Sequence, residues 1–443
     1  MNFWMTVIGM YKDMIKSIVL IILVFSSMIL TYQIWNFKPE LTNVDSPVQQ
    51  KKTIGPRFVD NIKNIYMPYQ EISYKESSIK GTTDSRMIMD VTDYLSESKI
   101  LSAYQIDNNG KFQAKDIGGN FTIFDFTVDI PQTMYITNIL DMTYKSNDTH
   151  TFKRILIDSE SRNSINLYLV GKDKVLKIET DAKSEPFNEL VKQQRNEMVN
   201  YSGLVTNENT SSDKAQLYMP ANAKDIKAYR FIADRIDVRD INDAVLDDQD
   251  NIIERERKEG TTFFSNTGVV SVNANDIYKY NNLSEANEAR TLPRETLVKS
   301  FKFISSHGGF TDDYRLFDIE DDIRTINYQM FLSGRPVFNK DGLSDISVIW
   351  GKNEEYEYRR GLLSTSVAVP STQEVEKLPS AEKVRFDIAS SRSYQFEKVS
   401  NMLIGYEMKK SADSEIQANL LFEPYWYIEY NGKWLKYDRG RLK

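Results

Sequence analysis

The chain has 443 residues, a formal net charge of −7, two histidines and no cysteine. Without cysteine it can hold no disulfide, thiolate metal site, acylated cysteine or cysteine nucleophile. An acidic chain without a basic stripe is also a poor partner for nucleic acid. Its content of 41% hydrophobic and 27% charged residues is typical of a globular protein. Its length is sufficient for two or three domains.

An uncharged stretch of 21 residues, 17–37, lies near the N-terminus. As a helix it would reach roughly 32 Å, enough to cross the hydrocarbon core of a bilayer. Lys12 and Lys16 precede it, the pattern of a signal anchor whose N-terminus stays in the cytoplasm. The alternative is a cleaved signal peptide, but the apolar core is too long and no small-x-small cleavage site follows it. We therefore predict a single-pass cell-membrane protein with residues 1–16 cytoplasmic and an extracytoplasmic body.

Within the predicted span, Ser27 and Thr31 lie four residues apart and share one helix face. Small and hydroxylated residues favour close packing and hydrogen bonds between helices in lipid. Ser27 and Thr31 are thus the candidate transmembrane contact with another membrane protein. The alternative is that both hydroxyls bond back to carbonyls of their own helix.

After a polar, aperiodic linker at 38–54, the sequence predicts an α+β protein: a transmembrane helix followed by a multi-domain ectodomain of antiparallel sheets with packed helices. We expect an N-terminal α+β domain over 55–185, a middle one over 186–291 and a C-terminal one over 292–443. In the first, Asp84 begins a helix, and strands follow at 121–128, 152–158 and 165–170, with a hairpin turn at 171–173.

The middle and C-terminal domains are each predicted to begin with a helix and continue as an antiparallel meander. In the middle domain Pro186 opens the helix and Gly203 ends it, and the strands lie within 228–241 and at 252–256 and 263–272. In the C-terminal domain Pro293 lies in the first turn of the helix and Gly308–Gly309 end it. Four strands follow at 314–319, 325–332, 346–350 and 355–360.

The sequence offers little to support catalysis. His150 lies in a polar loop, and His307 precedes the glycine pair at a predicted helix end. The motifs of a serine nucleophile elbow, a zinc helix, a phosphate loop and a dinucleotide fold do not occur. The acidic runs at 247–250 and 318–322 resemble solvated turns, because the first lacks the glycine of a calcium loop. We predict a non-enzyme without catalytic, cofactor-binding or metal-ligating residues, although paired carboxylates leave a wall hydrolase as an alternative.

The C-terminus is rich in aromatic residues. Asn431-Gly432 predicts a tight hairpin turn between two strands. On the outgoing strand Tyr425 and Tyr427 share one face, and Trp434 follows on the returning strand. Tyrosine and tryptophan are enriched at protein interfaces, so Tyr425, Tyr427 and Trp434 are the candidate partner-binding residues. The alternatives are a buried core and a platform for a cell-wall glycan or a lipid.

Five segments together resemble the YycH family over essentially the whole chain. They are Gly55-Pro56-Arg57-Phe58, residues 331–338, residues 358–363, residues 378–381 and Glu423-Pro424-Tyr425-Trp426-Tyr427. The resemblance implies a membrane-anchored regulator of a Gram-positive cell-wall two-component system. It implies association with a YycI-like membrane protein and action on the sensor histidine kinase YycG (WalK), without a catalytic role or cofactor.

Overall fold

The computed structural model describes residues 61–443, apart from 77, 109–111, 113–118, 161–163, 206–215, 224–225, 247–251, 287–294, 321–324, 370–377 and 412–417, and describes residues 20, 23, 24, 27 and 28 near the N-terminus. It forms two compact units, Met1–Lys51 and Lys52–Lys443. No helix within the described residues is both long enough and apolar enough to cross a membrane. Most of the predicted span at 17–37, the linker at 38–54 and the Gly55–Phe58 segment lie outside the described residues.

In the second unit, a sheet of nine described strands runs in the order β3-β7-β6-β5-β4-β1-β2-β8-β9, and every pairing in it is antiparallel. Its strands are β1 (Gln70–Lys75), β2 (Ser78–Thr82), β3 (Ile100–Asp107), β4 (Phe121–Pro131), β5 (Thr151–Asp158), β6 (Ser164–Val170), β7 (Lys174–Lys183), β8 (Val199–Val205) and β9 (Gln216–Pro220). Four helices accompany them: α2 (Ile62–Ile65), α3 (Ser85–Ser96), α4 (Gln132–Asn138) and α5 (Ser184–Gln194).

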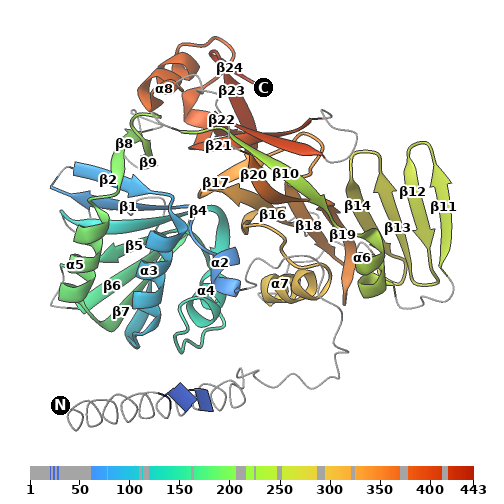
Figure 1. Ribbon diagram of the computed structural model, residues 1–443. Coiled ribbons are helices and arrows are strands. Elements are labelled where there is room, and N and C mark those ends of the chain that lie inside the picture. Colours follow the sequence, from blue (N-terminus) through green and yellow to red (C-terminus); the bar gives the residue numbers. More distant parts are fainter. Residues whose placement is uncertain are drawn as a thin grey trace, which may run out of the picture. The chain divides into compact units, whose positions relative to one another are not determined.

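Helices α3 and α5 cover one face of this sheet (Figure 1). Helix α3 begins at Asp84, whose carboxylate accepts from the amide of Arg86, as the sequence predicts. The inner side of α3 buries Ile88, Val91 and Leu95 against the central strands. Strand β4 covers the strand predicted at 121–128 and is buried on both faces along most of its length.

The second sheet has 15 described strands and follows β11-β12-β13-β14-β19-β18-β16-β17-β21-β22-β10-β20, with β15 on β16, β23 on β22 and β24 on β23. Its strands are β10 (Tyr229–Arg235), β11 (Ile253–Arg257), β12 (Gly260–Phe264), β13 (Gly268–Asn273), β14 (Ile277–Asn282), β15 (Tyr314–Glu320), β16 (Thr325–Leu332), β17 (Arg335–Phe338), β18 (Asp345–Trp350), β19 (Glu355–Gly361), β20 (Leu363–Val369), β21 (Val399–Ser411), β22 (Asn419–Tyr430), β23 (Lys433–Asp438) and β24 (Arg441–Leu442). Its helices are α6 (Val238–Val245), α7 (Thr296–Ser306), α8 (Ala381–Ala389) and a 3-10 turn at Phe396–Lys398. Among these pairings, only that of β17 with β21 is parallel.

The α+β class with mostly antiparallel sheets is confirmed, but three predicted elements are wrong. Helix α5 ends at Gln194, and Gly203 lies inside β8, where it pairs with Tyr218. Helix α6 replaces the strand expected near Ile241, because the Asp237 carboxylate caps it by accepting from the amide of Arg239. The segment 263–272 is divided between β12 and β13 by a turn.

The strands of the predicted middle domain, 186–291, are shared between the two sheets: β8 and β9 extend the first, and β10 to β14 belong to the second. The domain boundaries at 185/186 and 291/292 stay predictions. The C-terminal end of α7 matches expectation. His307 caps it, and Gly308 and Gly309 follow with positive φ angles of 104° and 65°.

The first sheet buries a carboxyl group without a hydrogen bond. Glu71 on β1 is fully buried, and neither of its carboxylate oxygens has a hydrogen-bond partner among the described residues. Burial, with a smaller contribution from the charge of Asp90, raises the pKa of Glu71 to about 8. The side chain is therefore neutral in the folded protein at neutral pH.

Because the pKa of Glu71 is raised on folding, its contribution to stability is complete below about pH 4.5 and is lost as the pH rises through about 8. Replacing Glu71 by Gln keeps the site neutral at every pH. Between pH 5 and pH 8 we expect wild type to lose roughly 3 kcal/mol of unfolding free energy relative to Glu71→Gln. Denaturant titration at both pH values measures this difference, with the exposed Glu185→Gln as control. Parallel pH dependences of wild type and Glu71→Gln would contradict the assignment.

Candidate functional site

The C-terminal hairpin of β22 and β23 forms as the sequence predicts. Asn431 and Gly432 make its turn with positive φ angles of 51° and 72°, which Asn and Gly tolerate better than other residues. Strand β22 pairs with β21 along most of its length and with β23 on its other side near the turn. The hairpin is therefore held by a long ladder and presents two distinct faces.

The inner face of the hairpin packs against α8. Trp426 and Ile428 are fully buried with Val384 and Ile388 of α8. The indole nitrogen of Trp426 donates to the carbonyl of Pro379 at 2.9 Å. This face is core, and Trp426 is fixed in it by both packing and a hydrogen bond.

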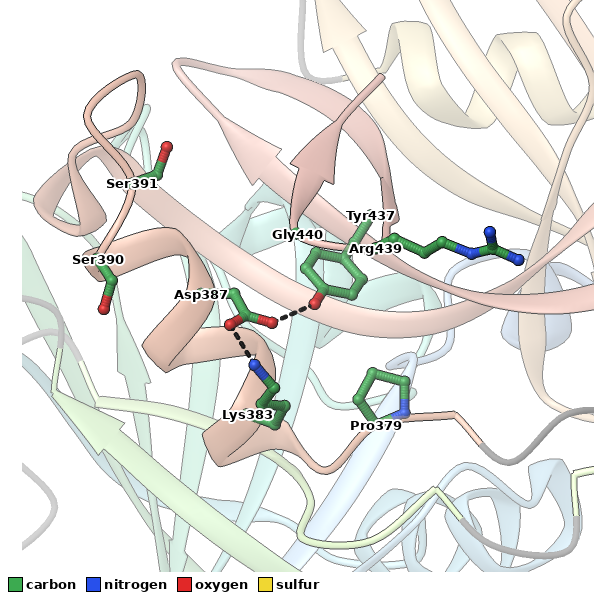
Figure 2. A pocket seen from close by; sticks show the side chains of 8 residues that line it. All are labelled: Pro379, Lys383, Asp387, Ser390, Ser391, Tyr437, Arg439 and Gly440. Atoms are coloured by element: carbon green, nitrogen blue, oxygen red, sulfur yellow. Dashed lines mark hydrogen bonds and ion pairs between the residues drawn. The ribbon is translucent and has the colours of Figure 1, made fainter.

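Beside α8 lies a surface hollow of about 580 Å³ (Figure 2). At its edge the Asp387 carboxylate accepts from the hydroxyl of Tyr437 at 2.6 Å and from the ammonium of Lys383. The hydrogen bond from Lys383 is the largest cause that lowers the pKa of Asp387, followed by that from Tyr437. These three groups satisfy one another and fasten β23 to α8.

On the other face, Tyr427 belongs to an aromatic cluster that we call the junction cluster: Tyr69, Phe317, Phe331, Leu403 and Tyr427, with Phe338, Tyr425 and Trp434 at its border. Tyr427 is only 4% exposed and stacks on Phe338, with the ring centres 3.8 Å apart. Trp434 also contacts this cluster through Phe317 and Phe338. Tyr427 is therefore an internal anchor, whereas Tyr425 and Trp434 are partly exposed at the border.

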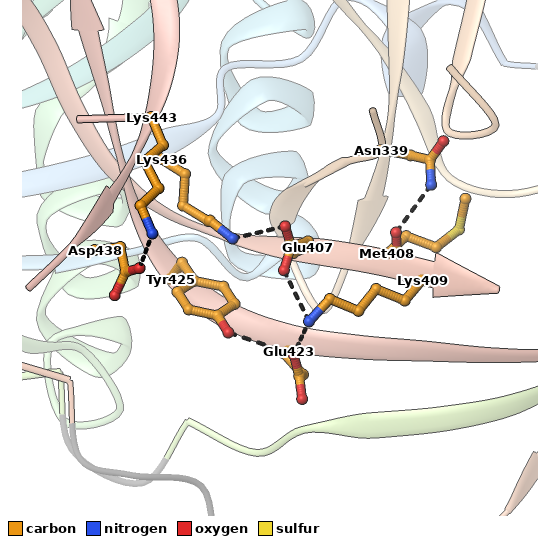
Figure 3. Close-up of polar contacts among 9 residues, drawn as sticks. All are labelled: Asn339, Glu407, Met408, Lys409, Glu423, Tyr425, Lys436, Asp438 and Lys443. Atoms are coloured by element: carbon orange, nitrogen blue, oxygen red, sulfur yellow. Dashed lines mark hydrogen bonds and ion pairs between the residues drawn. The ribbon is translucent and has the colours of Figure 1, made fainter. Parts of the chain in front are cut away.

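A network of ionic contacts surrounds Tyr425 (Figure 3). The Lys436 ammonium lies 2.7 Å from the Glu407 carboxylate and 4.6 Å from the ring centre of Tyr425. The Lys409 ammonium lies 3.0 Å from Glu407 and 2.6 Å from Glu423. The Tyr425 hydroxyl donates to Glu423 at 3.3 Å. The partly exposed ring of Tyr425 is thus held in place by charges that are already paired.

The register of the sheet explains why Lys409 is needed. Glu407 on β21 and Glu423 on β22 are directly opposite each other, an arrangement of like charges that destabilises a strand pair. Lys409 bridges both carboxylates. Burial alone would raise the pKa of Glu407, but hydrogen bonds from Lys436 and Lys409 outweigh it and hold that pKa below its usual value.

This surface has the composition of a binding surface for another protein. Aromatic rings are enriched at the centres of protein interfaces, and polar and charged groups lie at the rim of such interfaces. No group of residues suited to a metal ion occurs within the described part of the chain. The Nδ1 of His307 donates to the carbonyl of Phe303 at 2.7 Å and the imidazole stacks on the Phe303 ring, consistent with the predicted place of His307 at a helix end.

The structure thus brings Tyr425 and Trp434 to one surface and buries Tyr427 beneath it. Sequence reasoning missed Glu407, Lys409 and Lys436, because their meeting depends on the register of β21 against β22 and β23. The available signal was the pair Glu407 and Lys409, opposite charges two residues apart and therefore on the same face of a strand. Ser27 is helical and exposed, and Thr31 lies outside the described residues.

Comparison with known proteins assigns the chain to a family. Residues 13–199 match the family described as YycH protein, N-terminal domain, and residues 214–440 match YycH protein, C-terminal domain. The chain belongs to the YycH family. The predicted resemblance is therefore confirmed, and the candidate surface lies in the C-terminal domain of the family.

A relative from Bacillus subtilis (strain 168), named two-component system WalR/WalK regulatory protein YycH, is 22% identical over 462 aligned positions. The alignment covers 98% of each chain. The crystal structure of YycH from Bacillus subtilis aligns with a TM-score of 0.68 and 17% identity, covering 88% of this chain and all of the other. This likeness confirms that the fold is shared.

The structure predicts different outcomes for neighbouring tyrosines of β22. Tyr427→Ala removes a buried ring from the junction cluster and should cost about 3 kcal/mol of unfolding free energy or more. Tyr425→Ala removes a partly exposed ring and should cost about 1 kcal/mol or less. Denaturant unfolding of the two variants measures both values. Equal losses would show that Tyr425 is as much a part of the core as Tyr427.

Proposed function

We propose that the chain is a non-catalytic, membrane-anchored regulator of a WalR/WalK-type two-component system, acting outside the cytoplasm through protein contacts. The observation that carries this proposal is the alignment of 98% of the chain with 98% of a relative that bears the name of a WalR/WalK regulatory protein. The alignment leaves no large segment of either chain unmatched. Family membership of both halves supports the same role.

A regulator of this kind can change a sensor kinase only through contacts that differ between the signalling states of the kinase. We assign one such contact to Tyr425 and Trp434, with a YycI-like membrane protein as the direct partner and the kinase as the final target. The polar groups around Tyr425 are paired with one another, as suits a surface that is dehydrated on binding. No reaction is assigned to it.

The predicted anchor at 17–37 supplies the second contact. Its Ser27 and Thr31 face is proposed to pack against the transmembrane helices of the kinase through close contact and hydrogen bonds. With residues 1–16 in the cytoplasm, the body from Lys52 onward lies on the outer side of the cell membrane.

Co-purification from detergent-solubilised membranes tests the function. We expect the tagged full-length chain to retain a second single-span protein and a sensor histidine kinase, and its deletion to change the output of that kinase in a transcriptional reporter. Purification of the chain alone, together with an unchanged reporter, would contradict the proposal.

The hairpin assignment predicts that Tyr425→Ala weakens the complex with the YycI-like partner by about 2 kcal/mol, or some 30-fold in Kd. Titration of the two full-length proteins in detergent measures the affinity. Tyr104→Ala is a matched control, because Tyr104 is 46% exposed on β3 and also lies beside a lysine, Lys177. Unchanged affinity in a folded Tyr425→Ala protein would move the interface elsewhere.

The orientation predicts that protease added to intact spheroplasts digests the body from Lys52 onward while Met1 to Lys16 stays protected. An epitope tag at each end, detected after digestion, measures this. Protection of the C-terminal tag, or a mature protein that begins beyond residue 37, would contradict the proposed anchor.

A further inference from the structure

A cleft of about 1040 Å³ lies in the first unit of sheet and helices, remote in sequence from the C-terminal hairpin. The exposed side of α5 forms one wall, and the ends of β1, β4 and β5 form the other. Hydroxyl groups line its floor, from Ser73, Thr122, Ser159 and Ser184. The Ser184 hydroxyl is buried and has no hydrogen-bond partner within the described residues.

One end of this cleft is positively charged. Arg195 turns away from the end of α5 and crosses to β1, where its guanidinium donates to the carbonyl and hydroxyl of Ser73 at 2.7 and 2.9 Å. Lys80 donates to the carbonyl of Arg195 at 2.8 Å. Both cations are therefore bonded to neutral oxygens, and neither lies within 4.0 Å of a carboxylate in the described part of the chain.

The electrostatics of Arg195 agree with this geometry. Burial lowers its pKa, and no nearby acidic group acts in the opposite direction. A partly buried guanidinium without a counter-charge gains most from a bound carboxylate, which it can hold through two parallel hydrogen bonds. The basic end of the cleft thus favours an anionic group.

The other end of the cleft is acidic. Glu185 lies in the first turn of α5, and Glu160 follows β5. Glu189, between the two ends, is already paired with Lys192 at 3.1 Å. Glu185 and Arg195 are ten residues apart along the helix direction, which corresponds to roughly 15 Å at 1.5 Å per residue. The cleft therefore presents opposite charges at its two ends.

We propose that this cleft binds a short peptide with free termini, its carboxylate at Arg195 and Lys80 and its ammonium at Glu185 and Glu160. An extended peptide advances about 3.3 Å per residue, so about four to five residues span the separation. The hydroxyl groups that line the cleft can bond to the peptide backbone. This site goes beyond the regulatory function proposed above and does not depend on it.

Isothermal titration of the full-length chain in detergent with tetra-alanine tests the site. We expect saturable binding of the peptide with free termini and at least a tenfold loss when its C-terminus is amidated. Acetylation of its N-terminus should also weaken binding. Arg195→Gln should bind the free peptide as weakly as wild type binds the amidated one, and amidation should then cause no further loss.

Lys192→Gln is the matched control, because Lys192 lies on the same side of α5 but is paired with Glu189. It should bind tetra-alanine as wild type does. The comparison of free and amidated peptide on wild-type protein does not depend on the folding of any variant. Equal affinity for the two peptides, or binding of inorganic phosphate without binding of tetra-alanine, would overturn the proposal.

Discussion

The junction cluster, in which the buried ring of Tyr427 stacks on Phe338 at the border, holds the two sheets together. The cluster includes Tyr69, just before the first sheet, and residues from β15, β16, β21 and β22 of the second. Hydrogen bonds join the same regions, from the Tyr69 hydroxyl to Asn401 at 3.2 Å and from the Thr127 hydroxyl to the carbonyl of Phe317 at 2.8 Å. The two sheets are thereby packed as one unit.

The junction cluster restricts the conformations of the side chains that pack against it. Arg315 is almost fully buried, lies over the ring of Phe331 and donates to Ser85 at the start of α3. Tyr425 and Trp434 lie at the border of the junction cluster, so their positions are set by the core beneath them. A rigid aromatic surface loses little conformational entropy on binding. The positions of Tyr425 and Trp434 are therefore tied to the packing between the two sheets.

Much of the local structure could be predicted from the sequence because it depends on local chemistry. The Asp84 cap, the glycine pair after α7 and the Asn431-Gly432 turn are short-range signals, and each is found where expected. The distribution of strands between the sheets could not be predicted. Strand β10 pairs with β22, although the two strands lie almost two hundred positions apart in the sequence. The residue pattern of neither strand indicates which strand is its partner.

The same limit applies to the candidate surface. The alternation of side-chain direction along β22 correctly assigned Trp426 and Tyr427 to opposite faces of the strand. It could not reveal that α8 covers Trp426 and that Phe338 covers Tyr427. The bridging role of Lys409 depends on the exact opposition of Glu407 and Glu423, which only the register supplies.

Site-specific photo-crosslinking in living cells tests the central claim, that this chain acts through the surface around Tyr425. A photoreactive amino acid at position 425 should crosslink to one membrane protein of the two-component complex, whereas the same group at the exposed position 104 should not. Identical crosslinks at both positions, or no crosslink at 425 in cells where the chain still regulates the kinase, would contradict the account.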